Sequence, residues 1–175
     1  MKMKILLIAV YLLLAGTTAF AQGEKIGYVD SQIILTQYPA AIKAQGDLDA
    51  LTNLWSAQLD SMTLGYQQSL ADYQKQVNVM TEDQQLAAQQ TIVGMEQKIV
   101  EFRRLKFSQP DGEIFRKQEE IFAPIKSKIY GSIETVAKEE GMKFVFDKSG
   151  DILLLYADAA FDVTFKVLDN LKRGN

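Results

Sequence analysis

One apolar stripe determines most of what this chain can fold into. Between Leu48 and Met80 an apolar residue recurs every three or four positions, and nine such steps span 32 residues. This spacing lies between the periods of a straight α-helix and a coiled coil, so it predicts one long amphipathic helix. A helix from Pro39 to Met80 would extend roughly 60 Å at 1.5 Å per residue and must project from a small domain. The predicted seam consists of Leu48, Leu51, Trp55, Leu59, Met62, Tyr66, Leu70, Tyr73, Val77 and Met80.

A second helical segment follows after a short turn at residues 81–83. Thr81 with Gln84 three positions later is the pattern of a capping box, which marks the start of a helix. The sequence therefore predicts an antiparallel helical hairpin, a coiled-coil arm that comprises residues 39–140. The return limb carries its own apolar stripe, formed by Leu86, Ile92, Met95, Ile99, Phe102 and Leu105.

The return limb contains residues that interrupt or end helices. Pro110 and Gly112 predict a break at residues 108–112. Helical periodicity resumes at residue 113 and continues to Gly141, which is a suitable C-terminal cap. Pro124 lies inside this stretch, so we expect it to kink or locally break the helix and to bend the return limb.

Short segments at both ends of the sequence predict a small β-sheet. Residues 25–30 have the β-branched and aromatic composition of a strand, and Ser31 is placed to cap a short helix after it. Residues 143–147 and 151–156 predict a β-hairpin, and residues 162–173 predict a closing helix. The two ends can meet only if the arm is inserted between them. The inward side chains of the closing helix are predicted to be Val163, Val167, Leu168 and Leu171.

The predicted fold is α+β and predominantly helical. A discontinuous body of residues 22–38 and 141–175 carries the arm of residues 39–140. Such a body is near the lower size limit for independent stability, and unpaired edge strands favour association with further copies. We therefore expect a homo-oligomer assembled through the sheet. The predicted oligomerisation strand is formed by Ile26, Tyr28 and Val29.

The first 21 residues have the features of a secretory signal peptide. Lys2 and Lys4 precede an apolar run at residues 5–15, and small residues allow cleavage after Ala21. The run is shorter than the roughly 20 apolar residues that a membrane span needs. Cleavage reduces 19 basic residues to 17 against 22 acidic ones, a net charge of −5. A mature protein outside the cytoplasm is predicted, and its charge argues against nucleic acid as a partner.

The sequence lacks the side chains that most enzymatic sites require. It contains neither His nor Cys, which excludes a Ser-His-Asp triad, a Cys-His pair, a His-ligated metal, a disulfide and a lipid-modified Cys. It contains no P-loop and no dinucleotide-binding pattern. Acidic neighbours such as Glu119 and Glu120 lie in helical stretches, where adjacent side chains point apart. We expect no enzyme activity, no cofactor and no metal.

A second, weaker stripe runs along the arm beside the seam. It comprises Ala50, Leu54, Ala57, Ser61, Leu64, Gln68 and Ala71 on the first limb, with Val93, Val100 and Phe107 on the return limb. Two interpretations remain open. This stripe either widens the core or packs on the body, or it lines a space between arms and touches an apolar partner. Under the second interpretation the partner-facing residues are Leu54, Ala57, Leu64, Ala71, Val93, Val100 and Phe107.

These motifs, in this order, resemble the Skp (OmpH-like) periplasmic chaperones. The similarity is carried by residues 25–30 followed by Tyr38-Pro39, by residues 124–141, by 144–147, and by 154–157 with 162–164. The resemblance implies a homotrimer whose β body holds three arms, and these arms enclose unfolded outer-membrane proteins without using nucleotide. One departure is charge. Residues 39–107 carry six basic and eight acidic side chains, whereas well-known members have positively charged arms, so contact with anionic lipid or lipopolysaccharide is left open.

The functional expectation is an ATP-independent periplasmic holdase chaperone. Unfolded β-barrel strands alternate apolar and polar residues, which makes them prone to aggregate in water although they contain no long apolar run. Many weak contacts between arms would keep such a chain soluble. The alternative is a non-catalytic coiled-coil spacer or adaptor in the cell envelope. A spacer needs a specific arm surface and would lose binding through one or two substitutions, which a holdase should tolerate.

Overall fold

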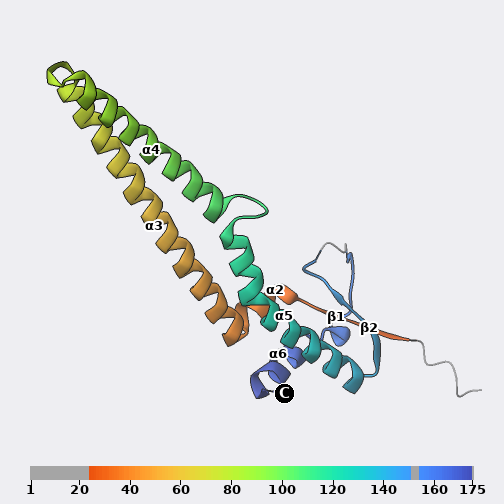
Figure 1. Ribbon diagram of the computed structural model, residues 1–175. Coiled ribbons are helices and arrows are strands. Elements are labelled where there is room, and N and C mark those ends of the chain that lie inside the picture. The colour runs from red at the N-terminus through yellow and green to blue at the C-terminus, as the bar shows by residue number, and fades with distance from the viewer. Residues whose placement is uncertain (1–23, 151–153, 175) are drawn as a thin grey trace, which may run out of the picture.

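The computed structural model describes residues 24–150 and 154–174, so the predicted signal peptide lies outside the described residues. A long two-helix arm projects from a small body that contains both ends of the described chain (Figure 1). Within the described residues there are five α-helices and a two-stranded sheet, which confirms the predicted fold class.

The arm is an antiparallel pair of helices. Helix α3 spans Pro39–Gln76 and helix α4 spans Glu82–Phe107. The α-helix ends four residues before Met80, because Val77–Val79 forms a 3₁₀ turn. Valine and asparagine are weak helix formers, and 3₁₀ turns are frequent at helix ends. The capping box is confirmed: the Thr81 hydroxyl accepts a bond from the Gln84 N–H, and the Gln84 carboxamide oxygen accepts one from the Thr81 N–H.

The predicted break in the return limb is confirmed, but the predicted effect of Pro124 is only partly seen. The loop at residues 108–112 separates α4 from helix α5, Glu113–Glu139. Gly112 is required there, because a Cβ atom would lie 2.6 Å from the Ser108 carbonyl oxygen. Helix α5 continues through Pro124 without a break. The buried neighbours Ile125 and Ile129 hold the helix against the body core, which compensates for the hydrogen bond that proline cannot donate. Helix α5 does change direction between arm and body (Figure 1).

The sheet joins the two ends of the chain. Strand β1, Lys25–Val29, pairs in parallel with strand β2, Met142–Asp147. Parallel neighbours need a crossover connection, and the intervening helices, arm included, supply it. On the other edge of β1 the Val163 N–H donates to the Tyr28 carbonyl at 3.0 Å.

The predicted β-hairpin is not present in the described residues. Residues 154–156 form no strand, and the rest of the predicted strand, residues 151–153, lies outside the described chain. Leu155 and Tyr156 are 87% and 83% exposed. A segment that pairs with no strand gains no ladder hydrogen bonds, so apolar composition alone does not make it a strand.

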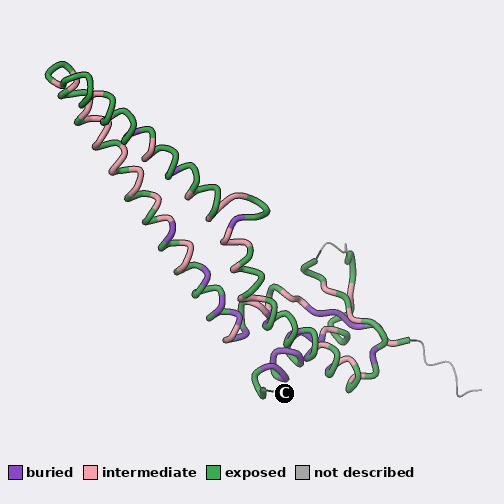
Figure 2. Tube along the Cα trace, viewed as in Figure 1, coloured by how far each residue is buried: buried purple, intermediate pink, exposed green. Residues whose placement is uncertain are grey.

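The body core lies where helices α2, α5 and α6 meet the sheet. Helix α2 spans Ser31–Gln37 and helix α6 spans Thr164–Arg173. The four predicted inward residues of the closing helix are all buried. Figure 2 shows burial concentrated in the body and at the base of the arm. The core cluster contains Val29, Ile34, Tyr38, Ala41, Ala44, Ile125, Ile129, Val136, Met142, Val163, Val167, Leu168 and Leu171.

Ser31 does not cap α2 as predicted. The cap is Asp30, whose carboxylate accepts a bond from the Ile33 N–H at 3.0 Å. An extended residue just before the helix is the right place for a cap, and carboxylates cap well. Ser31 instead donates its N–H and its hydroxyl to Asp147 at the end of β2.

Asp147 therefore ties β1 and α2 to the end of β2. It also accepts bonds from the N–H and the hydroxyl of Ser149. Partial burial opposes ionisation, but the hydrogen bonds from Ser31 and Ser149 outweigh it and hold the pKa of Asp147 below its ordinary value.

Stability of the body should depend on this carboxylate at low pH. The folded pKa lies below the unfolded value of about 3.9, so the stabilisation is complete above about pH 4 and is lost as pH falls through the folded pKa. We expect the difference in free energy of unfolding between wild type and Asp147→Asn to shrink as pH falls from about 6 to about 3. Urea unfolding at one protein concentration over a pH series measures it. A difference that does not change with pH would contradict this role.

Candidate functional site

All ten predicted seam residues are at least partly covered. Leu48 and Trp55 are buried and the other eight are half-buried. On α4, Ile92 and Ile99 are buried opposite them. Burial decreases towards the tip of the arm (Figure 2), where Val79 is 85% exposed.

Two contacts give the register of the hairpin. The rings of Trp55 and Phe107 meet edge to face with centroids 6.3 Å apart, and the Gln89 amide donates to the Tyr73 hydroxyl at 2.6 Å. In an antiparallel hairpin of constant register, the numbers of two facing residues have a constant sum. Both pairs add to 162. The two limbs therefore stay in one register over most of the length of the arm.

Two residues of the predicted return stripe point away from the seam. Leu86 and Leu105 are 56% and 49% exposed. Each lies six residues from a buried isoleucine, Ile92 or Ile99, and six residues are about 1.7 helical turns. The predicted return stripe therefore included two residues, Leu86 and Leu105, that lie outside the face of α4 covered by α3.

The predicted partner-facing residues separate into two groups. Leu54, Leu64, Val93 and Val100 are at least half exposed, and Ala57 is also exposed. Ala71 is half-buried. Phe107 packs on Trp55, so its ring lies between the limbs rather than on the outside of the arm. Exposed aliphatic side chains on a projecting hairpin, without a covering element in the described chain, are typical of a surface that meets another molecule.

A groove that the sequence did not predict lies between the two limbs. Its volume is about 570 Å³, and none of the seven predicted partner-facing residues lines it. The sequence signal is Gly94, because a glycine inside a helix costs about 1 kcal/mol and is interpreted as allowing either close contact between the limbs or flexing of the arm. A Cβ atom at Gly94 would meet nothing within 4 Å, so the glycine leaves open space instead. The groove is lined by Gln58, Met62, Gly94, Gln97, Lys98, Glu101, Phe102 and Leu105.

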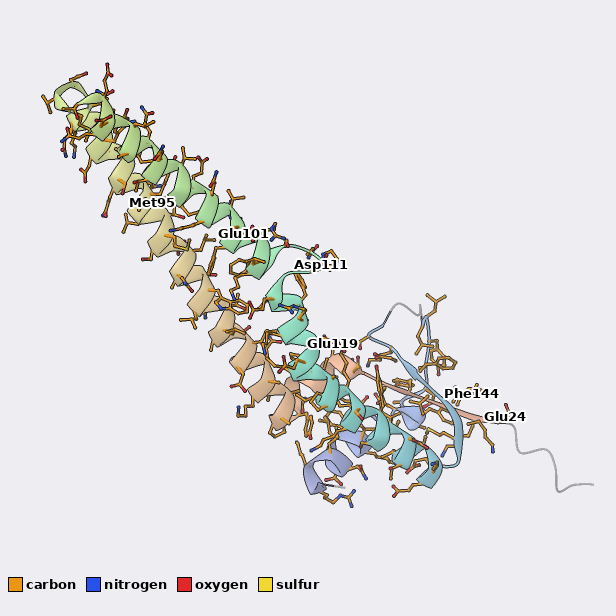
Figure 3. The ribbon with its side chains drawn as sticks, viewed as in Figure 1. Glu24, Met95, Glu101, Asp111, Glu119 and Phe144 are labelled. Carbon is orange, nitrogen blue, oxygen red and sulfur yellow. The ribbon has the colours of Figure 1, made fainter. Side chains whose placement is uncertain are left out.

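Two ion pairs lie at or near the groove. Arg104 lies 2.7 Å from the Glu101 carboxylate, and its hydrogen bond holds the pKa of Glu101 below the ordinary value. Glu101 lies on α4 in the lower half of the arm (Figure 3). At the end of α4 Lys106 lies 4.5 Å from the centre of the Trp55 ring and pairs with Glu113 at the start of α5.

The body exposes a second apolar surface. Ile26, Phe144 and Phe146 are 48%, 55% and 39% exposed, and Phe144 lies at the end of the body away from the arm (Figure 3). Tyr28 and Val29 are buried in the chain's own core. Of the predicted oligomerisation strand, only Ile26 presents its side chain outward.

Neither a metal cluster nor a membrane helix is found in the described chain. Residues 24–150 and 154–174 contain no group of three or more acidic side chains placed to hold a metal ion. Over the same residues, every helix is too short or too polar to cross a bilayer.

The fold agrees with a known family. A model of the outer membrane protein (OmpH-like) family matches residues 25–171, which include the whole arm and most of the body. The chain belongs to the OmpH-like family. This confirms the resemblance to Skp (OmpH-like) chaperones, and family membership supports a chaperone-type role.

A solved structure shares this fold despite low sequence similarity. It is the crystal structure of a candidate outer membrane chaperone (OmpH-like) from Caulobacter crescentus CB15, with a TM-score of 0.72 and 12% identity. The match covers 88% of this chain and 90% of that one. No curated protein sequence matches the chain.

Proposed function

We propose that the protein is an ATP-independent periplasmic holdase that binds unfolded outer-membrane β-barrel proteins between its arms and prevents their aggregation. The observation that carries this proposal is the exposure of Leu54, Leu64, Val93 and Val100 on an arm that projects from the body. Scattered aliphatic side chains on a polar helical surface favour weak, adaptable contacts rather than one tight fit. Such contacts suit unfolded barrel strands, whose apolar residues alternate with polar ones.

Assembly of several arms around one client requires an oligomer, and we propose a homotrimer. The exposed apolar surface of the body at Ile26, Phe144 and Phe146 supports assembly there, because surfaces of this kind mark protein interfaces. The number three comes from the resemblance to the Skp family. The proposed location is the periplasm, reached through cleavage of residues 1–21 after Ala21.

The proposal is tested by the mass of a soluble complex. Mature protein, starting at Gln22, is mixed with an outer-membrane β-barrel diluted from urea and sized with light scattering. We expect a soluble complex of about three copies of the chain and one barrel. Aggregated barrel beside an unchanged protein peak would contradict the holdase and favour the spacer or adaptor.

A further inference from the structure

We propose that the groove between the two limbs, beside Gly94, is a docking site for an extended, uncharged apolar segment of an unfolded polypeptide. We call it the mid-arm groove. This inference rests on the proposed function. It specifies which surface of the arm binds the client and proposes that apolar contacts and hydrogen bonds to the peptide backbone hold it. The groove volume of about 570 Å³ lies within the roughly 300–1,000 Å³ typical of ligand sites, enough for a few side chains of an extended chain.

The floor of the groove is apolar and open. Met62 from α3 and Phe102 and Leu105 from α4 supply flexible or aromatic surface. Methionine adapts its shape to different partners, which suits a site that must accept many sequences. Gly94 leaves space that any larger side chain would fill, since nothing lies within 4 Å of the position of its Cβ atom.

The rim offers amides to a peptide backbone. Gln58 on α3 and Gln97 on α4 line the groove from opposite limbs, and both are exposed. Neither carboxamide hydrogen-bonds to another group in the described part of the chain. Each carries both donors and an acceptor, which match the alternating N–H and C=O groups of an extended chain whatever its sequence.

The groove carries little charge, so it does not favour a strongly charged partner. Its lining contains one cation, Lys98, and one anion, Glu101. The carboxylate of Glu101 accepts two bonds from Arg104, which leaves Lys98 as the one lining charge without an ion-pair partner in the described chain. Across residues 39–107 the balance is six basic to eight acidic side chains, so the arm has no excess of positive charge that would collect acidic clients.

The test fills the groove without disturbing the hairpin. In Gly94→Leu the new side chain enters open space, and leucine is a better helix former than glycine. The matched control is Gly131→Leu on α5, where a Cβ atom also meets nothing within 4 Å and which does not line the groove. Gly94→Ala adds only a methyl group and provides a second, milder variant should the leucine variant fold poorly.

The probe is a labelled, uncharged peptide of alternating valine and threonine, and binding to the full mature protein is measured by fluorescence anisotropy. We expect Gly94→Leu to weaken peptide binding by about tenfold, which corresponds to about 1.4 kcal/mol. Gly94→Ala should weaken binding less. Gly131→Leu should leave it unchanged. Raising salt from about 0.1 M to about 1 M shortens the Debye length from about 10 Å to about 3 Å and should change the affinity by less than about threefold.

Three results would overturn the inference. Equal peptide binding by wild type and Gly94→Leu would remove the groove from recognition, and loss of binding at high salt would indicate electrostatic capture instead. A change in the mass of Gly94→Leu alone would mark the groove as a contact between copies of the chain. Equal protection of the whole barrel by wild type and Gly94→Leu is expected, because many weak contacts share a large client and only the short peptide reports on the groove. Peptide binding that depends on Gly94, without protection of the barrel, rejects the holdase only.

Discussion

Removing residues 59–72 and 90–103 together is expected to abolish most client capture while the molecule stays folded. The two deletions are two heptads each, and both pairs of end points add to 162, so they preserve the register set by Trp55 with Phe107 and Tyr73 with Gln89. The arm becomes about 21 Å shorter. It loses Leu64, Ala71, Val93 and Val100 together with most of the groove. The measure is the amount of outer-membrane barrel kept soluble after dilution from urea, which we expect to fall by about tenfold or more.

Two controls separate loss of function from loss of fold in the shortened arm. Trp55 is the one tryptophan in the sequence and lies buried beside Phe107 between the limbs, so its fluorescence reports whether the hairpin still packs. The mass of the oligomer reports on the body, whose core cluster contains no residue between Ala44 and Ile125. A single Val93→Ser substitution should cost little, because many weak contacts share the load. Full protection by the shortened protein would contradict the holdase.

Leu168→Ala is expected to destabilise the body by about 2–5 kcal/mol, because it leaves a cavity in a close-packed core. Leu168 is 2% exposed and belongs to the cluster that joins α6 to α5 and α2. Small domains have a total stability of only about 5–15 kcal/mol, so the variant should unfold at a much lower urea concentration. The midpoint of urea unfolding, followed by circular dichroism at one protein concentration, measures the effect.

Phe165→Ala on the same helix is the matched control. Phe165 is 64% exposed, and surface substitutions usually change stability by less than about 0.5 kcal/mol. Equal loss in the two variants would indicate that the exposed face of α6 is covered in the oligomer. A small effect of Leu168→Ala would show that the body core can collapse around the missing side chain.

Local signals in the sequence were sufficient for the helices of the arm. The stripe from Leu48 to Met80, the capping box at Thr81 and the break at Pro110 and Gly112 each depend on neighbouring residues. These features specify where a helix begins, continues and ends. The structure differs at the last turn of α3, where Val77–Val79 forms a 3₁₀ turn.

Interactions between distant segments could not be predicted in the same way. Residues 154–156 have strand composition but form no strand, whereas β1 pairs with β2 on one side and with the segment at Asp162 on the other. Asp30 rather than Ser31 caps α2, since Asp147 at the end of β2 binds Ser31. Each outcome depends on a partner more than 100 residues away in the chain.

Helical periodicity, caps and breakers act over a few residues, so they were enough to predict a long helical hairpin inserted into a small α+β body. Which side chains of that hairpin remain exposed depends on how its two helices pack. The register of Trp55 with Phe107 fixes which faces of α3 and α4 cover each other. It leaves Leu86 and Leu105 outside the seam and opens the groove beside Gly94. Exposure is a property of two packed helices, and no stripe on one helix specifies it.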